Sequence, residues 1–244
     1  MQKISVIEEI ERFIGYFKHK YQIIKNTNFE ESGELFKKII YIAMIDALAK
    51  TVFPKCNNRM RFVKFIKNFS DWNNCKKISL PHLGRLIDLT PEPEYEEVRK
   101  FIASQYDQWV PTYIISLDKD PDYEKVLKYW PKEKIDNKII KVSNLKLESI
   151  QHAHLLYSYR NVLVHELRIL GYGAEELSLK QEPSYHFMNT LNGETTWELV
   201  YPLGFFEKIC ESCIDKLYKH LIKNKINPYQ FFAFGSYWLD ELNE

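Results

Sequence analysis

Apolar residues at helical spacing constrain the fold of this chain more than any other feature. The segment 30–53 contains the run LFKKIIYIAMIDALAKTVF, which is apolar on almost every side of a helix and is typical of a central helix. Residues 4–25 and the basic segment 58–72 also follow the helical period. Gly is scarce, at 8 residues in 244, which disfavours barrels, sandwiches and Gly-rich nucleotide-binding folds. We therefore expect a mainly α-helical fold.

The rest of the chain predicts further helices and one β-hairpin. The expected helices cover residues 79–89, 91–109, 121–130, 145–170 and 203–224. Ser143 or Asn144 is expected to cap the helix at 145–170, and Gly171 to end it. Two strand-like runs flank Asn192-Gly193, a pair typical of a type I′ turn, and predict a hairpin at 184–201. The segment VPTYIISL fits helix and strand equally. No linker or repeat is visible, so we expect a single domain over 1–244.

The cysteines and the hydropathy pattern bear on the cellular compartment of the protein. No signal peptide and no apolar run of membrane-spanning length are visible, which predicts a cytoplasmic protein with reduced thiols and no membrane partner. Cys210-x-x-Cys213 fits half of a redox or zinc site, but it lies in an amphipathic helical pattern and no second pair has ligand spacing. We expect no metal and no cofactor.

Positive charge gathers in one part of a chain whose formal net charge is only +1. The segment between residues 50 and 85 contains nine basic residues and a single acidic one. Such a segment fits either a solvated helix face or a patch that meets an anionic partner. If it meets RNA, the residues expected to hold the backbone are Arg59, Arg61, Lys64 and Lys67.

The stretch YRNVLVHE, residues 159–166, places polar groups inside a helical pattern. Residues four apart share a helix face, so Tyr157, Asn161 and His165 form one stripe, with Arg160 beside it. An imidazole moves protons near neutral pH, and a guanidinium holds phosphate oxygens bidentately. RNA supplies its own nucleophile in the 2′-hydroxyl. These groups therefore suit metal-independent cleavage of RNA. They also suit a structural hydrogen-bond network between helices.

Spacing alone makes the pattern weakly specific. About 0.6 pairs of Arg with His five to seven residues later are expected by chance, and Arg12 with His19 is one further match. Requiring Asn directly after the Arg lowers the expectation to roughly 0.04, and only Arg160-Asn161…His165 meets it. His152 and other polar residues earlier in this helix fit surface or packing positions.

YRNVLVHE resembles the signature of the HEPN superfamily, in which Arg precedes His by four to six intervening residues and a polar residue often follows the Arg. The resemblance implies a helical bundle, here with a β-hairpin inserted after the motif helix, that forms a homodimer with one composite site. It implies a metal-independent endoribonuclease of a toxin–antitoxin or phage-defence system, with an antitoxin such as a minimal nucleotidyltransferase as partner.

The resemblance also implies roles for individual residues. Arg160 and His165 would be the catalytic pair, with Asn161 as a polar helper. Asp46, inside an apolar run, would support them by pairing with Arg160 or His165. Independently of the resemblance, the place of Tyr157 on the stripe suits it to stack a base or to hydrogen-bond a phosphate, in support of the same site. The competing interpretation is a non-catalytic HEPN-like domain that binds RNA or a protein, or that regulates another subunit. Asp46 also fits a surface position or a pair with a lysine.

Overall fold

The structure is a computed structural model that describes residues 5–109, 113–132, 139–171, 181–189 and 193–231. The chain divides into two compact units, which are considered one at a time. Unit 1 comprises residues 1–71 and 206–244, and unit 2 comprises residues 72–205. The single domain expected from the sequence stays a prediction.

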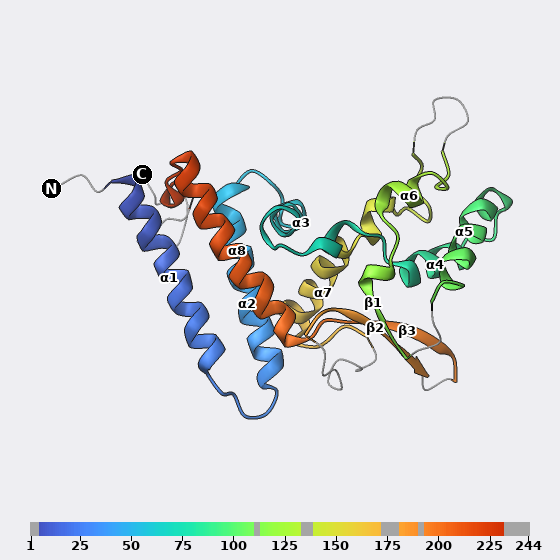
Figure 1. The fold of residues 1–244 in the computed structure, drawn as a ribbon, viewed down its shortest axis with the longest axis horizontal. Helices are drawn as coiled ribbons and strands as arrows, with labels where there is room; N and C mark the ends of the chain where they lie inside the picture. Colours follow the sequence, from blue (N-terminus) through green and yellow to red (C-terminus); the bar gives the residue numbers. More distant parts are fainter. Residues whose placement is uncertain (1–4, 110–112, 133–138, 172–180, 190–192, 232–244) are drawn as a thin grey trace. The chain divides into compact units, whose positions relative to one another are not determined.

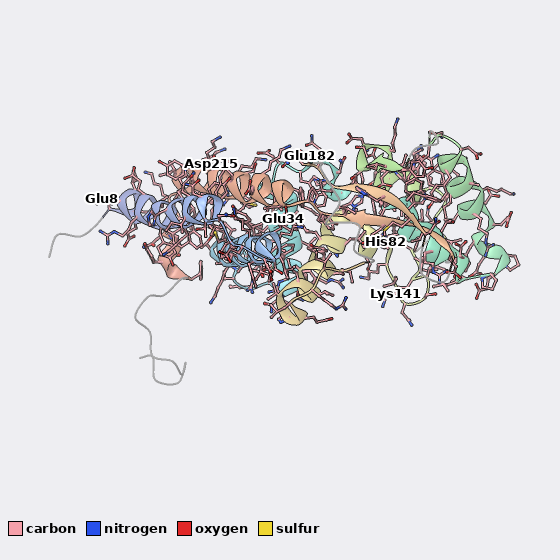
Figure 2. All side chains as sticks on the ribbon, turned by 90° about the horizontal axis from the view of Figure 1, so that it is seen from below. Glu8, Glu34, His82, Lys141, Glu182 and Asp215 are labelled. Atoms are coloured by element: carbon pink, nitrogen blue, oxygen red, sulfur yellow. The ribbon has the colours of Figure 1, made fainter. Side chains whose placement is uncertain are left out.

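Unit 1 is built from helices. They are α1 (Val6–Asn26), α2 (Gly33–Val52), α3 (Asn58–Phe69) and most of α8 (Leu203–Asn224), followed by a short 3-10 turn at Pro228–Gln230. Figure 1 shows α1, α2 and α8 running alongside one another. A salt bridge of 2.9 Å joins Lys18 of α1 to Asp215 of α8, which Figure 2 labels.

α2 is a largely apolar helix with many buried residues. Both sides of it pack into the interior, at Tyr41, Ile42, Met44, Ile45, Leu48 and Ala49. The prediction of a central helix is confirmed. The amphipathic pattern of α1 likewise buries one face and begins at a capping box in which Ser5 and Glu8 satisfy each other's backbone N–H groups.

Unit 2 combines short helices with a small sheet. Its α-helices are α4 (Leu80–Asp88), α5 (Glu96–Tyr106), α6 (Tyr123–Leu127) and α7 (His152–Glu166). Single 3-10 turns lie at Asn73–Lys76, Pro93–Tyr95, Leu117–Lys119 and Leu147–Ile150. A hydrophobic core joins α4, α5 and α6 through buried residues that include Leu83, Val98, Phe101, Val126 and Trp130.

The sheet confirms the predicted hairpin and adds a strand to it. β2 (Ser184–Asn189) and β3 (Thr195–Val200) pair antiparallel. β1 (Ile114–Ser116), from the segment that fitted helix and strand equally, pairs with β2 to give the order β1-β2-β3. Gly193 has a φ of 79°, which suits glycine in a tight turn, while Asn192 lies outside the described residues.

Both predicted boundaries of the helix at 145–170 are wrong. The first part is a separate 3-10 turn, and α7 itself begins at His152. Ser143 and Asn144 cap nothing, because both have positive φ values, 46° and 64°, in a turn that precedes the helix. α7 ends at Glu166 because Leu167, and not Gly171, takes the left-handed conformation that follows it.

The fold is therefore mainly helical with a small antiparallel sheet. Among the described residues, no helix combines the length and the apolar character needed to cross a membrane.

Candidate functional site

The motif lies on α7, a helix that buries one face and leaves the other more exposed. Its buried residues recur at helical spacing: His152, Ala153, Leu156, Tyr159 and Leu163. These side chains fix the helix in unit 2 by packing. Tyr157, Asn161 and His165 occupy the other side, Arg160 lies near the edge of the buried face, and all four are half-buried or exposed. The helix can therefore hold them in place without using them as core.

Arg160 brings the motif side chains together. Its Nη1 donates hydrogen bonds to Asn161 Oδ1 at 3.0 Å and to His165 Nε2 at 3.1 Å. Its guanidinium carbon lies 5.9 Å from the centre of the Tyr157 ring, within the range of a cation–π contact. The three residues predicted to form one stripe thus all contact the guanidinium of Arg160.

The contact between Arg160 and His165 determines which imidazole nitrogen carries the proton. A guanidinium only donates hydrogen bonds, so Nε2 of His165 must be the acceptor. In the neutral ring the proton is therefore on Nδ1. His165 is exposed and stands in the last turn of α7.

Asp46 and the basic residues expected to hold RNA belong to unit 1. Asp46 is half-buried on α2. Its pairing with Arg160 or His165 stays a prediction. On α3, Arg59 and Lys64 are exposed, while Arg61 and Lys67 are half-buried. Phe62, Val63, Phe65, Ile66 and Phe69 form the buried side of the same helix. The basic residues therefore lie away from that core, as a surface for an anion requires.

The cysteine pair gives little support to redox chemistry. Cys210 and Cys213 are free thiols buried on α8. Burial raises the pKa of both thiols, and a nearby glutamate also raises that of Cys210. A buried thiol with a raised pKa has the character of an inert structural cysteine.

A second polar cluster in unit 2 was not found by sequence reasoning. Asp120 is at its centre and is fully buried. Its Oδ2 accepts hydrogen bonds from His152 Nε2 at 2.6 Å and from the Tyr185 hydroxyl at 2.7 Å. Its Oδ1 accepts one from the Leu80 backbone N–H at 2.9 Å. His152, interpreted as a surface or packing residue, is the fully buried partner of a carboxylate.

Two further side chains extend this cluster toward the surface. The Tyr185 hydroxyl lies 2.7 Å from Ser79 Oγ, which lies 2.7 Å from His82 Nδ1. Burial, and then the charge of Asp120, raises the pKa of Tyr185. Loss of hydration, and then the nearby His152, lowers the pKa of His82 to about 4, although the residue as a whole is exposed. His82 is therefore neutral at neutral pH. Figure 2 labels His82.

The Asp120 cluster is structural in character. Ser79, Asp120, His152 and Tyr185 are all buried, so no substrate can reach the serine or the carboxylate. Only His82 of this group is exposed. The cluster therefore positions chain segments and does not resemble a hydrolytic triad, which needs an accessible nucleophile.

Comparison of the chain with protein-family models, curated proteins and solved structures gives no match. The geometry of α7 is thus the basis for any functional assignment. The HEPN resemblance rests on the motif alone, and it enters below as a proposal.

Proposed function

We propose that the protein is a HEPN-like, metal-independent endoribonuclease that uses the 2′-hydroxyl of RNA as its nucleophile. The observation that carries the proposal is that Asn161 and His165 both accept hydrogen bonds from the guanidinium of Arg160 on α7. A phosphate-binding cation and a proton acceptor then lie within one hydrogen bond of each other. Transesterification of RNA needs both groups and no other cofactor.

The reaction divides between the two side chains. His165 Nε2 takes the proton from the 2′-hydroxyl, and the 2′-oxygen forms a bond to the adjacent phosphorus. The guanidinium of Arg160 stabilises the negative charge that develops on the non-bridging oxygens. The bond from phosphorus to the 5′-oxygen breaks, and that oxygen takes up a proton. The products are a 2′,3′-cyclic phosphate and a free 5′-hydroxyl.

A second copy of the chain fits this scheme. One histidine cannot both accept the first proton and donate the second in the same step. In a homodimer with a composite site, the partner copy would supply the acid for the leaving oxygen. This assembly, and a nucleotidyltransferase antitoxin as partner in a toxin–antitoxin or phage-defence system, follow from the HEPN resemblance and belong to the proposal.

The alternative function is a non-catalytic RNA-binding, interaction or regulatory domain. One observation favours it: His165 Nε2 already accepts a hydrogen bond, as a member of a structural network would. Under this alternative Arg160 would still hold phosphate, but no RNA would be cut.

Incubation of total RNA with the full-length protein in EDTA, followed by a denaturing gel, tests the proposal. Wild type should cut the RNA. Because general acid–base catalysis contributes about 10²–10⁴-fold, His165→Ala should lose at least about 100-fold in rate, and Arg160→Ala should also lose activity. The chain offers matched controls, Arg12→Ala and His19→Ala, at an exposed pair of similar spacing on α1.

Circular dichroism would verify that each variant is folded. Cutting by wild type and by both controls, but not by the motif variants, supports the proposal. Binding of RNA without cutting by the folded wild type supports the non-catalytic alternative. Activity that disappears completely in EDTA contradicts the metal-independent mechanism.

A further inference from the structure

The acceptor nitrogen of His165 is occupied in the described structure. Arg160 Nη1 carries two protons, and two acceptors lie near it: Asn161 Oδ1 at 3.0 Å and His165 Nε2 at 3.1 Å. The lone pair of Nε2 therefore faces a permanent cation. A general base needs that lone pair for the proton it removes. In this arrangement His165 cannot act as a base at Nε2.

We propose that Arg160 masks His165 until a phosphodiester binds, and that the phosphate unmasks the base by drawing the guanidinium onto its own oxygens. This inference rests on the proposed function, since the phosphodiester is that of RNA. The inference goes beyond the proposed function, because substrate binding becomes the event that frees His165 to act as a base. The same arginine then binds the substrate and controls the histidine.

Charge determines the direction of the exchange. The imidazole that accepts from Arg160 is neutral, whereas a phosphodiester carries a full negative charge and two non-bridging oxygens. The hydrogen bond to His165 joins the guanidinium to a neutral ring, whereas a pair with phosphate joins opposite charges and makes two parallel hydrogen bonds. When both acceptors are within reach, the guanidinium therefore favours the phosphate.

Local anchors keep the movement of the arginine small. Asn161 follows Arg160 directly, and Tyr157 lies one turn before it on the same helix. Both contact the guanidinium, so it can turn away from His165 without leaving the site. The released Nε2 then lies beside the bound phosphate, where the 2′-hydroxyl of the substrate is found.

The competing explanation is a fixed structural contact between Arg160 and His165. A fixed contact would persist when phosphate binds, because the arginine would be part of the helix packing. On addition of a phosphodiester, masking therefore predicts that Nε2 of His165 loses its hydrogen bond to Arg160. A fixed contact predicts that Nε2 keeps it.

Nitrogen-15 NMR of the imidazole rings in the full chain measures this directly. The chain contains 7 His, and His165→Gln assigns the resonances of His165. The spectra would be recorded well above the ordinary histidine pKa, so that the ring is neutral. The probes are dimethyl phosphate and a 2′-O-methyl oligoribonucleotide, which lacks the nucleophile and is not consumed. Sodium chloride at matched ionic strength is the control.

Arg160→Ala supplies the reference for an unmasked histidine. Without a probe, the wild type should show the Nδ1–H tautomer with a hydrogen-bonded Nε2. On addition of either probe, the Nε2 resonance should move to the position found in Arg160→Ala, and the preference for the Nδ1–H form should be lost. Arg160→Ala itself should not respond to the probes, and sodium chloride should change nothing.

An Nε2 resonance that stays in place when the probes are added overturns the proposal. So does a wild-type spectrum identical to that of Arg160→Ala before any addition. The two proposals also fail separately. Cutting of RNA with an unchanged Nε2 resonance would remove the masking step and keep the ribonuclease. A probe-dependent release of Nε2 without cutting would remove the ribonuclease and leave a phosphate-responsive site.

Discussion

The head group of Arg160 contacts three side chains of its own helix. Asn161 and His165 accept from the same nitrogen, and the Tyr157 ring lies beside the guanidinium carbon. Lysine at this position would offer one point charge in place of a planar fork. The site is therefore a single local assembly, and its members are not independent contributors.

Substitutions of Tyr157 separate the work of its ring from that of its hydroxyl. Tyr157→Phe keeps the cation–π contact with Arg160 and should retain most RNA cleavage. Tyr157→Ala removes a contact worth about 0.5–1 kcal/mol at an exposed site and should raise KM roughly two- to five-fold. Steady-state kinetics on a short RNA measures both effects. A large loss in Tyr157→Phe would assign the main role to the hydroxyl, as a donor to phosphate.

This local assembly could be predicted from the sequence because all its members lie within nine residues of one helix. The spacing of helical positions placed Tyr157, Asn161 and His165 on one stripe, and the structure has them there. The Asp120 cluster could not be predicted in this way. Its hydrogen bonds join residues 32, 65 and 106 positions apart, and no local pattern encodes such pairs.

At the scale of elements, Asp120 connects the beginnings of two helices. Neither α4 nor α7 has a side-chain hydrogen bond from its own N-cap residue. Asp120 instead accepts from the backbone N–H of Leu80, the first residue of α4, and from the side chain of His152, the first residue of α7. One buried carboxylate thus replaces a local cap and fixes the start of the motif helix.

Removal of this carboxylate should destabilise the protein strongly. Asp120→Ala leaves His152 and Tyr185 buried without their acceptor, and breaking a buried pair in this way costs about 3–5 kcal/mol. Urea denaturation measures the free energy of unfolding. The matched control is Asp107→Ala, at an exposed aspartate after α5, which should change it by less than about 0.5 kcal/mol. Equal effects of the two substitutions would contradict the role given to Asp120.

Element boundaries were predicted less well than element types, and α7 shows why. Helical periodicity continues through residues 147–150, so the pattern gave no reason to separate them from the helix that follows. Gly171 was expected to end the helix because glycine adopts positive φ without strain. The chain turns earlier, at Leu167, which is 62% exposed and has a φ of 54°.

At the scale of the whole molecule, the residues named in the proposed function are divided between the two units. The reacting groups lie on α7 in unit 2, and the basic surface lies on α3 in unit 1. The net charge of +1 provides no general attraction for RNA, so the backbone contacts must come from such a local surface.

The salt dependence of RNA binding tests that surface. If Arg59 and Lys64 each contact a phosphate, Arg59→Gln with Lys64→Gln should weaken binding and reduce the slope of log K against log salt by about 0.7 per lost contact. Fluorescence anisotropy with a single-stranded RNA measures this slope. Lys100→Gln, at an exposed lysine of α5 that pairs with Glu97, is the control and should leave the slope unchanged. An unaltered slope in the double variant would assign α3 to a solvated face.

The chemical identity of the cleaved ends tests the central claim most directly. A defined RNA oligonucleotide would be cut in EDTA and its products analysed by mass spectrometry, beside the same oligonucleotide with a single 2′-deoxy nucleotide at the cleaved position. Attack by the 2′-hydroxyl predicts a 2′,3′-cyclic phosphate, a free 5′-hydroxyl and no cutting of the deoxy-substituted strand. Ends that carry a 5′-phosphate, or cutting that survives the deoxy substitution, would contradict the mechanism assigned to Arg160 and His165.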